Sequence, residues 1–111
     1  IKIKKNFKNK ILGVTCHSSK ILAKKAIKYK ANYLAFGSFE KSKLKPKAIR
    51  ANINILRWAK RNTKKKIVAI GGINNLNYKK FLNLGANYIA ISSYIWDNPK
   101  IKPEIAIRKL K

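Results

Sequence analysis

Glycine, hydroxyl and backbone amide groups mark one place in this sequence where chemistry could occur. The stretch at 67–75 is IVAIGGINN, in which a short apolar run ends at Gly71 and Gly72. Gly72 would let a ligand approach its N–H group closely, and the start of a following helix would favour an anion. Ser92 and Ser93 follow a second apolar run and add hydroxyl and amide hydrogens. These residues predict a phosphate site, although a tight strand-to-helix turn would also explain the two glycines.

Two further candidates lie where another apolar run ends in GVTCHSS. Thr15 offers a hydroxyl, and His17 has the residue type that suits a general acid or base near neutral pH. A positioning or surface role is the competing interpretation of His17. We expect Cys16, the single cysteine, to be a small buried residue. The predicted strand ends carry no carboxylate pair, Ser-His-Asp set or spaced metal ligands, so we predict no metal site from these residues.

Four short apolar runs must position these residues. Each is nearly continuous instead of alternating, which is typical of parallel strands covered on both faces. An internal repeat supports this interpretation, because YKANYLAFGS at 29–38 and LGANYIAISS at 84–93 share Ala-Asn-Tyr and a final Ser. The predicted strands are ILGVT at 11–15, YLAFG at 33–37, IVAIG at 67–71 and YIAIS at 88–92.

Segments with helical periodicity alternate with the predicted strands. They lie at 18–29 with Ser18 or Ser19 as the N-cap, at 47–62, at 75–85 with Gly85 at the end, and at 102–111 with Pro103 in the first turn. The order βαβαβαβα predicts an α/β fold with a parallel sheet and right-handed crossovers. Four such units are half of a TIM-type (β/α)8 barrel. A (βα)4 half barrel is therefore our prediction, and an open four-stranded sheet is the competing architecture.

Length and hydropathy indicate one domain with no membrane partner. The chain has 111 residues, 46% of them apolar, and no apolar run approaches the ~20 residues of a membrane span. One cysteine excludes an internal disulfide framework and fits a reducing compartment, so we expect a cytoplasmic location. The sequence contains no Met and opens with the basic stretch IKIKKNFKNK. We therefore expect a piece of a longer protein, with one domain over 1–111 and a lead-in at 1–10.

The chain is strongly basic, with 28 Lys plus Arg residues against three acids and a formal net charge of +25. Nucleic acid is the obvious partner for such a surface. The basic residues are mostly Lys, however, and are spread along the whole chain without a ladder of aromatic residues for stacking bases. Because Lys, Ile and Asn share A/T-rich codons, a drifting genome would also produce this excess. We expect a solvated basic surface and keep a nucleic-acid-binding module as an alternative.

The strand ends together resemble the thiamine phosphate synthase family from its fifth strand onward. The matching stretches are ILGVTCHSS, ANYLAFGSFEKSKLK, IVAIGGINNLN and LGANYIAISSYI, in the family's order and spacing. The resemblance implies the second half of a TIM barrel. It also implies thiamine biosynthesis by a transferase that joins aminopyrimidine-methyl diphosphate to thiazole phosphate, with Mg²⁺, to give thiamine phosphate and diphosphate.

The resemblance assigns roles to particular residues. The family's Thr-x-Thr-Lys motif corresponds to the stretch SKLK at 42–45, in which Lys45 would contact the departing diphosphate as the catalytic residue. Thr15 would bind the same pyrimidine substrate. The thiazole phosphate would be held by Ser42, Lys43, Leu44, Gly72, Ser92 and Ser93.

Three departures from the family pattern limit this prediction. Leu44 replaces the second threonine of the motif, and Glu40 stands where the family has an apolar or aromatic residue. The family's Mg²⁺-binding aspartates belong to the first half of the barrel, and the residues of this chain match only the second half. We therefore predict no turnover by this chain alone and self-association through open sheet edges. A thiazole tautomerase-like isomerase with His17 as its acid or base is the alternative enzyme.

Overall fold

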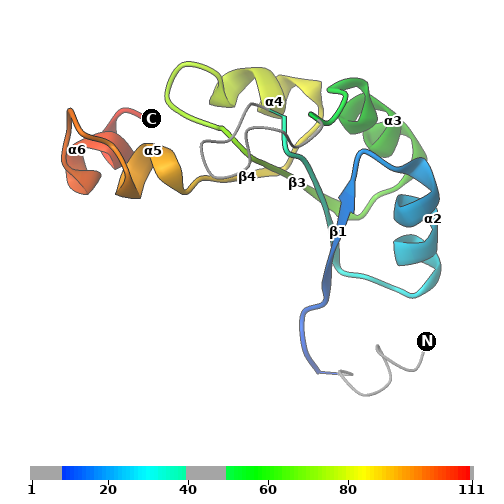
Figure 1. Ribbon diagram of the computed structural model, residues 1–111. Coiled ribbons are helices and arrows are strands. Elements are labelled where there is room, and N and C mark those ends of the chain that lie inside the picture. The colour runs from blue at the N-terminus through cyan, green and yellow to red at the C-terminus, as the bar shows by residue number, and fades with distance from the viewer. Residues whose placement is uncertain (1–8, 40–49, 111) are drawn as a thin grey trace.

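One parallel sheet forms the centre of the molecule, which the structure describes over residues 9–39 and 50–110. In the computed structural model its strands are β1 (Gly13–His17), β2 (Tyr33–Phe36), β3 (Lys66–Ile70) and β4 (Tyr88–Ala90). They lie in the order β1-β2-β3-β4, and each strand pairs in parallel with the next (Figure 1). The prediction of an α/β fold with a parallel sheet is confirmed.

Helices cover one side of this sheet. α2 packs on β1, α3 on β3 and α4 on β4, while α3 and α4 also contact each other. Figure 1 shows α5 and α6 beyond the β4 edge, away from α2. A barrel carries its helices on the outer face alone, so this arrangement is that of a partial TIM-type barrel. The helices are α2 (Lys20–Lys28), α3 (Asn54–Asn62), α4 (Tyr78–Leu84), α5 (Ser93–Trp96) and α6 (Pro103–Arg108).

The predicted helix caps have clear physical roles. Ser19, rather than Ser18, caps α2, because its Oγ accepts the Leu22 N–H at 3.1 Å. Gly85 ends α4 with φ 126°, and its N–H donates to the Leu82 carbonyl. Pro103 opens α6 as expected. These local signals therefore fixed where three of the helices begin or end.

Two helices begin later than their periodicity predicts, because asparagine side chains bind the preceding backbone. The Asn52 Oδ1 accepts the Asn54 N–H at 2.9 Å, and α3 begins only at Asn54. The Asn74 Oδ1 likewise accepts the N–H of Asn77, and α4 begins at Tyr78. Such turns compete with helical hydrogen bonds. β4 also ends early, at Ala90, and the short α5 that follows was not predicted.

The asparagines of the internal repeat join neighbouring strands at their amino ends. The Asn32 N–H donates to the Leu12 carbonyl at 2.7 Å, and the Asn32 Oδ1 accepts the Leu12 N–H at 2.7 Å. Asn87 makes the same pair of bonds to Ile67, at 2.8 and 2.9 Å. We call this two-bond arrangement the asparagine clamp. The repeated asparagine thus makes the same two hydrogen bonds at the amino ends of the β1–β2 pair and the β3–β4 pair.

The core lies between the sheet and α2, α3 and α4. The Phe39 and Phe81 rings pack with centroids 5.1 Å apart. Cys16 is fully buried, as the sequence predicted. Buried side chains from strands and helices therefore hold the strand ends at one edge of the sheet. The largest fully buried side chains are Phe36, Phe81, Leu34, Leu56, Ile67 and Cys16.

Candidate phosphate-binding edge

The loops after β3 and β4 leave the same edge of the sheet side by side. The two strands are parallel, and Ile70 pairs with Ala90 at their carboxyl ends. Gly71 and Gly72 follow the first strand directly, and Ser92 follows the second by two residues. The carboxyl edge of a parallel sheet is where α/β proteins bind ligands. The structure thus brings together the two loops that the sequence predicted as one site.

The glycine loop is held in a conformation that favours glycine. Gly71 and Gly72 have φ angles of 100° and 72°, in the left-handed region. A Cβ on Gly71 would lie 2.0 Å from the Ser38 Oγ, so the loop after β2 packs closely against it. The Asn77 Nδ2 donates to the Gly72 carbonyl at 3.0 Å. These contacts fix the orientation of the peptide groups around Gly72.

The serine loop leads directly into α5. The Ser92 carbonyl accepts the N–H groups of Ile95 and Trp96, both at 3.0 Å, and the Ser93 carbonyl accepts that of Asp97 at 2.9 Å. Both serines are exposed. Over residues 9–39 and 50–110, no acceptor binds the N–H groups of Gly72, Ser92 or Ser93. Three backbone donors and two hydroxyls are therefore available to an anion at this edge.

The end of β1 lies at the same edge and contains an irregularity. Thr15 pairs with Ala35 and His17 pairs with Phe36, so Cys16 is an extra residue in the strand. Thr15 and His17 are exposed, whereas burial raises the pKa of the Cys16 thiol. His17 has φ 53°, a left-handed conformation that is uncommon outside glycine. The irregularity turns Cys16 inward and leaves the two polar residues at the open edge.

The family model for thiamine monophosphate synthase matches residues 2–95 of this chain. The chain belongs to this family. It is 57% identical to the thiamine-phosphate synthase of Pelagibacter ubique over all 111 residues, which cover 54% of that relative. Over 93 residues it is 39% identical to the enzyme of the same name from Thiobacillus denitrificans, covering 84% of this chain and 44% of that one. The chain thus spans about half the length of the curated relatives it matches.

A solved structure supports the same family. The thiamine phosphate pyrophosphorylase from Pyrococcus furiosus superposes with a TM-score of 0.81 at 30% sequence identity. The match covers 96% of this chain and 50% of that one. The resemblance predicted from the strand ends is therefore confirmed, and an open sheet that covers half of a family member fits a partial barrel.

The family's Thr-x-Thr-Lys position lies outside the described residues. Ser42, Lys43, Leu44, Lys45 and Glu40 all belong to that segment. The residues that follow it return to the carboxyl edge, because the Ala51 N–H donates to the Ser38 carbonyl at 2.6 Å. The Asn52 N–H similarly donates to the Ser18 Oγ at 3.0 Å. The site roles of these five residues stay predictions.

Residues that sequence reasoning missed hold the loops of the candidate edge in place. Asn77 holds the Gly72 carbonyl, Ser38 packs on Gly71, and Ser18 binds the Asn52 N–H. The spacing of asparagines after the two glycines is a turn signal that would have identified Asn77. The contacts of Ser18 and Ser38 join segments far apart in the sequence, and no local pattern indicates them.

The described residues do not form a magnesium site. In the ranges 9–39 and 50–110, no three His, Cys, Asp or Glu side chains gather closely enough to hold a metal ion. The two acids in these ranges are Asp97, which follows α5, and Glu104 in α6. Mg²⁺ needs carboxylate, phosphate or water oxygens in octahedral geometry. These two carboxylates at the far end of the molecule do not fit that requirement.

Proposed function

We propose that this chain forms the C-terminal half of a thiamine phosphate synthase barrel, with one domain over residues 1–111. The observation that carries the proposal is the pairing of Ile70 with Ala90, which sets the glycine and serine loops side by side in a member of this family. The enzyme would act in thiamine biosynthesis as a transferase. It would join aminopyrimidine-methyl diphosphate to thiazole phosphate and release diphosphate.

The thiazole phosphate would bind at the glycine and serine loops. The N–H groups of Gly72, Ser92 and Ser93 and the two serine hydroxyls would donate to its oxygens. Hydrogen bonds to a charged phosphate are about twice as strong as those between neutral groups. In TIM barrels, the loops after the last two strands frequently form such a site, which supports this assignment.

The pyrimidine diphosphate would lie across the sheet edge toward β1. Thr15 would donate its hydroxyl, and Lys45 would place an ammonium beside the oxygens that gain charge as diphosphate departs. Stabilising charge that develops in the transition state is a strong catalytic effect. The aminopyrimidine can carry the positive charge left behind, so this step needs no protein base. Ser42, Lys43 and Leu44 would complete the phosphate contacts from the same loop.

Magnesium binding and cellular location also belong to this proposal. The Mg²⁺ ligands would lie in the first half of the barrel, because the described carboxylates do not fit the metal. No helix in the described part of the chain has the length and hydropathy to cross a membrane. A cytoplasmic location and association through the edges of β1 and β4 complete the proposal.

Binding of thiazole phosphate to the chain tests the site directly. We expect the exchange of Ser92 and Ser93 for Ala to weaken binding about tenfold, as the loss of charge-assisted hydrogen bonds predicts. Tyr29→Phe, which removes a hydroxyl at the C-terminal end of α2, serves as the control and should leave binding unchanged. Titration calorimetry measures both constants. Equal affinity in the serine variant and the parent would reject the proposed phosphate site.

Activity requires the other half of the barrel. The chain alone should release no diphosphate from the two substrates. A fusion to the first half of the Pelagibacter ubique relative, which is 57% identical to this chain, should release it. Exchanging Lys45 for Ala should then lower kcat by about 100-fold, in the range seen when a charge-stabilising donor is lost. A folded fusion that binds both substrates and stays silent would remove the transferase assignment.

The isomerase alternative rests on the exposed position of His17 at this edge. His17→Asn in the same fusion separates the two enzymes. A tautomerase would lose its activity entirely, whereas a synthase would keep most of its rate of diphosphate release. The nucleic-acid alternative predicts tight binding to RNA or DNA at physiological salt with a steep salt dependence, which filter binding measures.

A further inference from the structure

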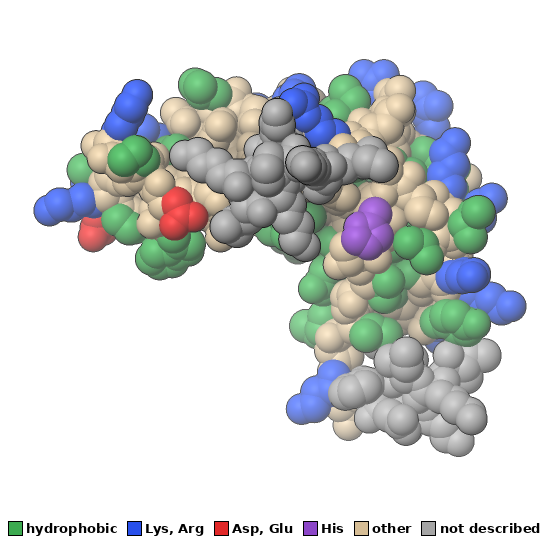
Figure 2. Space-filling model, viewed as in Figure 1, with side chains coloured by type: hydrophobic (Ala, Val, Ile, Leu, Met, Phe, Trp, Pro, Cys, Tyr) green, Lys and Arg blue, Asp and Glu red, His purple; other side chains and the backbone are tan. Residues whose placement is uncertain are grey.

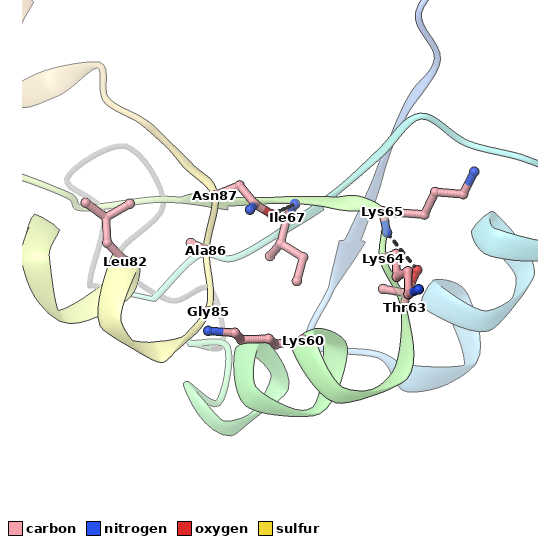
Figure 3. A pocket seen from close by; sticks show the side chains of 9 residues that line it. All are labelled: Lys60, Thr63, Lys64, Lys65, Ile67, Leu82, Gly85, Ala86 and Asn87. Atoms are coloured by element: carbon pink, nitrogen blue, oxygen red, sulfur yellow. Dashed lines mark hydrogen bonds between the residues drawn. The ribbon is translucent and has the colours of Figure 1, made fainter.

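A hollow of about 330 Å³ opens at the amino ends of β3 and β4, opposite the edge that carries the glycine and serine loops (Figure 3). Its wall comes from the end of α3, the turn before β3 and the segment between α4 and β4. Its lining is Lys60, Thr63, Lys64, Lys65, Ile67, Leu82, Gly85, Ala86 and Asn87.

The polar side chains of this hollow are hydrogen-bond donors. Lys60 and Lys64 line the hollow from adjoining segments, whereas Figure 3 shows the Lys65 side chain extending away from the hollow. The Asn87 Oδ1 already accepts the Ile67 N–H at 2.9 Å, which leaves its Nδ2 hydrogens for another acceptor. The Thr63 Oγ accepts the Lys65 N–H at 3.0 Å and keeps its hydroxyl hydrogen to donate. A ligand of this hollow must therefore supply acceptors.

The charge of the lysines exceeds what the neighbouring helices neutralise. α3 and α4 end beside the hollow, and each helix end carries roughly half a negative charge. The N–H groups of Gly85 and Ala86 already bind the carbonyls of Leu82 and Phe81 at the end of α4. The lining contains no carboxylate, so the positive charges of Lys60 and Lys64 meet at most about one negative charge from the helix ends. A net positive hollow with donor groups suits an anion of high charge.

We propose that this hollow binds the phosphate chain of a di- or triphosphate. The Lys60 and Lys64 ammoniums would contact neighbouring phosphate groups, and the Asn87 amide would donate to one of their oxygens. Ile67, Leu82 and Ala86 give the hollow an apolar side, against which a nucleoside attached to the chain would pack. The hollow is separate from the proposed thiazole-phosphate site, so the two proposals stand or fall independently.

Calorimetric titration of the full chain with inorganic triphosphate, ATP and adenosine, without metal at 0.15 M salt, tests the proposal. With thiazole phosphate present in excess to fill the glycine and serine loops, we expect one further site for triphosphate and for ATP and no binding of adenosine. Tighter binding of ATP than of triphosphate would identify a nucleotide as the ligand, and equal binding would identify the phosphate chain itself. Failure of triphosphate to bind, or a many-site isotherm typical of diffuse surface charge, would overturn the proposal.

The asparagine clamp supplies a variant with a matched control. Asn87→Asp keeps the oxygen that accepts the Ile67 N–H but places a negative charge in the hollow, so triphosphate binding should weaken at least about tenfold. Asn32→Asp makes the same change at the Leu12 clamp, which lies outside the hollow, and should leave binding unchanged. Equal weakening in both variants would mean that total charge, rather than this hollow, governs binding.

A second pair of variants avoids the strand contacts altogether. Lys60→Gln with Lys64→Gln removes two charges from the hollow, whereas Lys25→Gln with Lys28→Gln removes two from the last turn of α2. Only the first pair should weaken triphosphate binding. Amide resonances in two-dimensional NMR locate the ligand: shifts at 64–67 and 85–87 support the proposal, and shifts confined to Gly72 and Ser93 overturn it.

Discussion

Gly71 shows how one residue fixes the geometry of the candidate site. Its φ of 100° favours glycine, and an added Cβ would meet the Ser38 Oγ at 2.0 Å. We expect Gly71→Ala to lower the free energy of unfolding by about 2 kcal/mol or more, because it adds both backbone strain and a clash. Urea unfolding followed by circular dichroism measures this change. A loss below about 0.5 kcal/mol, the range of neutral surface substitutions, would contradict the close packing of these loops.

Cys16 illustrates a residue whose burial controls its chemistry. The thiolate is the reactive form of cysteine, and burial raises the pKa of this thiol above its ordinary value of 9.0. We expect Ellman's reagent at pH 8 to react with the native chain at least about 100-fold more slowly than with the chain in guanidinium. Equally fast labelling of both states would show that Cys16 is accessible.

The same thiol makes stability depend on pH in a defined direction. As pH rises past 9.0, the thiol of the unfolded chain ionises while the buried thiol stays protonated. The unfolded state then binds fewer protons, so the stabilising contribution of Cys16 falls above that pH. The comparison must be with Cys16→Ala, because the two proteins differ only in the thiol, and the stability of this variant should decline less between pH 8 and 10. Parallel curves for the two proteins would contradict the assignment.

At the scale of elements, the asparagine clamps predict an order of stabilities. Asn87→Ala leaves the partly buried Ile67 N–H without its side-chain acceptor, whereas Asn32→Ala exposes the Leu12 N–H to solvent. An unpaired buried donor costs about 1–3 kcal/mol, so we expect Asn87→Ala to destabilise the chain more than Asn32→Ala. Thermal unfolding of both variants gives the order. The Asp variants should lose less stability than the Ala variants, since they keep the acceptor oxygen.

The elements also show which local signals determined the fold and which did not. The apolar runs located β2, β3 and the start of β4 to within one residue, because buried parallel strands need apolar residues. β1 runs from Gly13 to His17, two residues later at both ends than the predicted 11–15. The start of α3 was missed because the side-chain bond of Asn52 competes with helical periodicity. α5 was missed because four residues are too short to show a period. At the site, the sequence predicted that Gly72 and Ser92 lie at one edge. The pairing of Ile70 with Ala90 depends on tertiary contacts, which no local sequence pattern shows.

On the scale of the whole molecule, charge and exposed apolar surface act in opposite directions. Tyr88 and Trp96, in β4 and α5, are 56% and 71% exposed beside a strand with no outer neighbour in the described sheet. Figure 2 shows Lys and Arg dispersed around the visible face, with the acidic side chains toward α5 and α6. A net charge of +25 repels a second copy while the open edges attract one. Salt concentration therefore decides which effect prevails.

We expect self-association of the chain to rise with ionic strength. The Debye length is about 30 Å at 0.01 M salt, comparable to the 29 Å width of the molecule, and about 8 Å at 0.15 M. Repulsion between whole molecules should keep the chain monomeric at low salt, and screening should allow dimers or larger species above about 0.15 M. Sedimentation velocity across this range measures the change. Tyr88→Lys places a charge on the open strand and should keep the chain monomeric at higher salt than the parent. A parent chain that stays monomeric at every salt concentration would show that its sheet edges are protected.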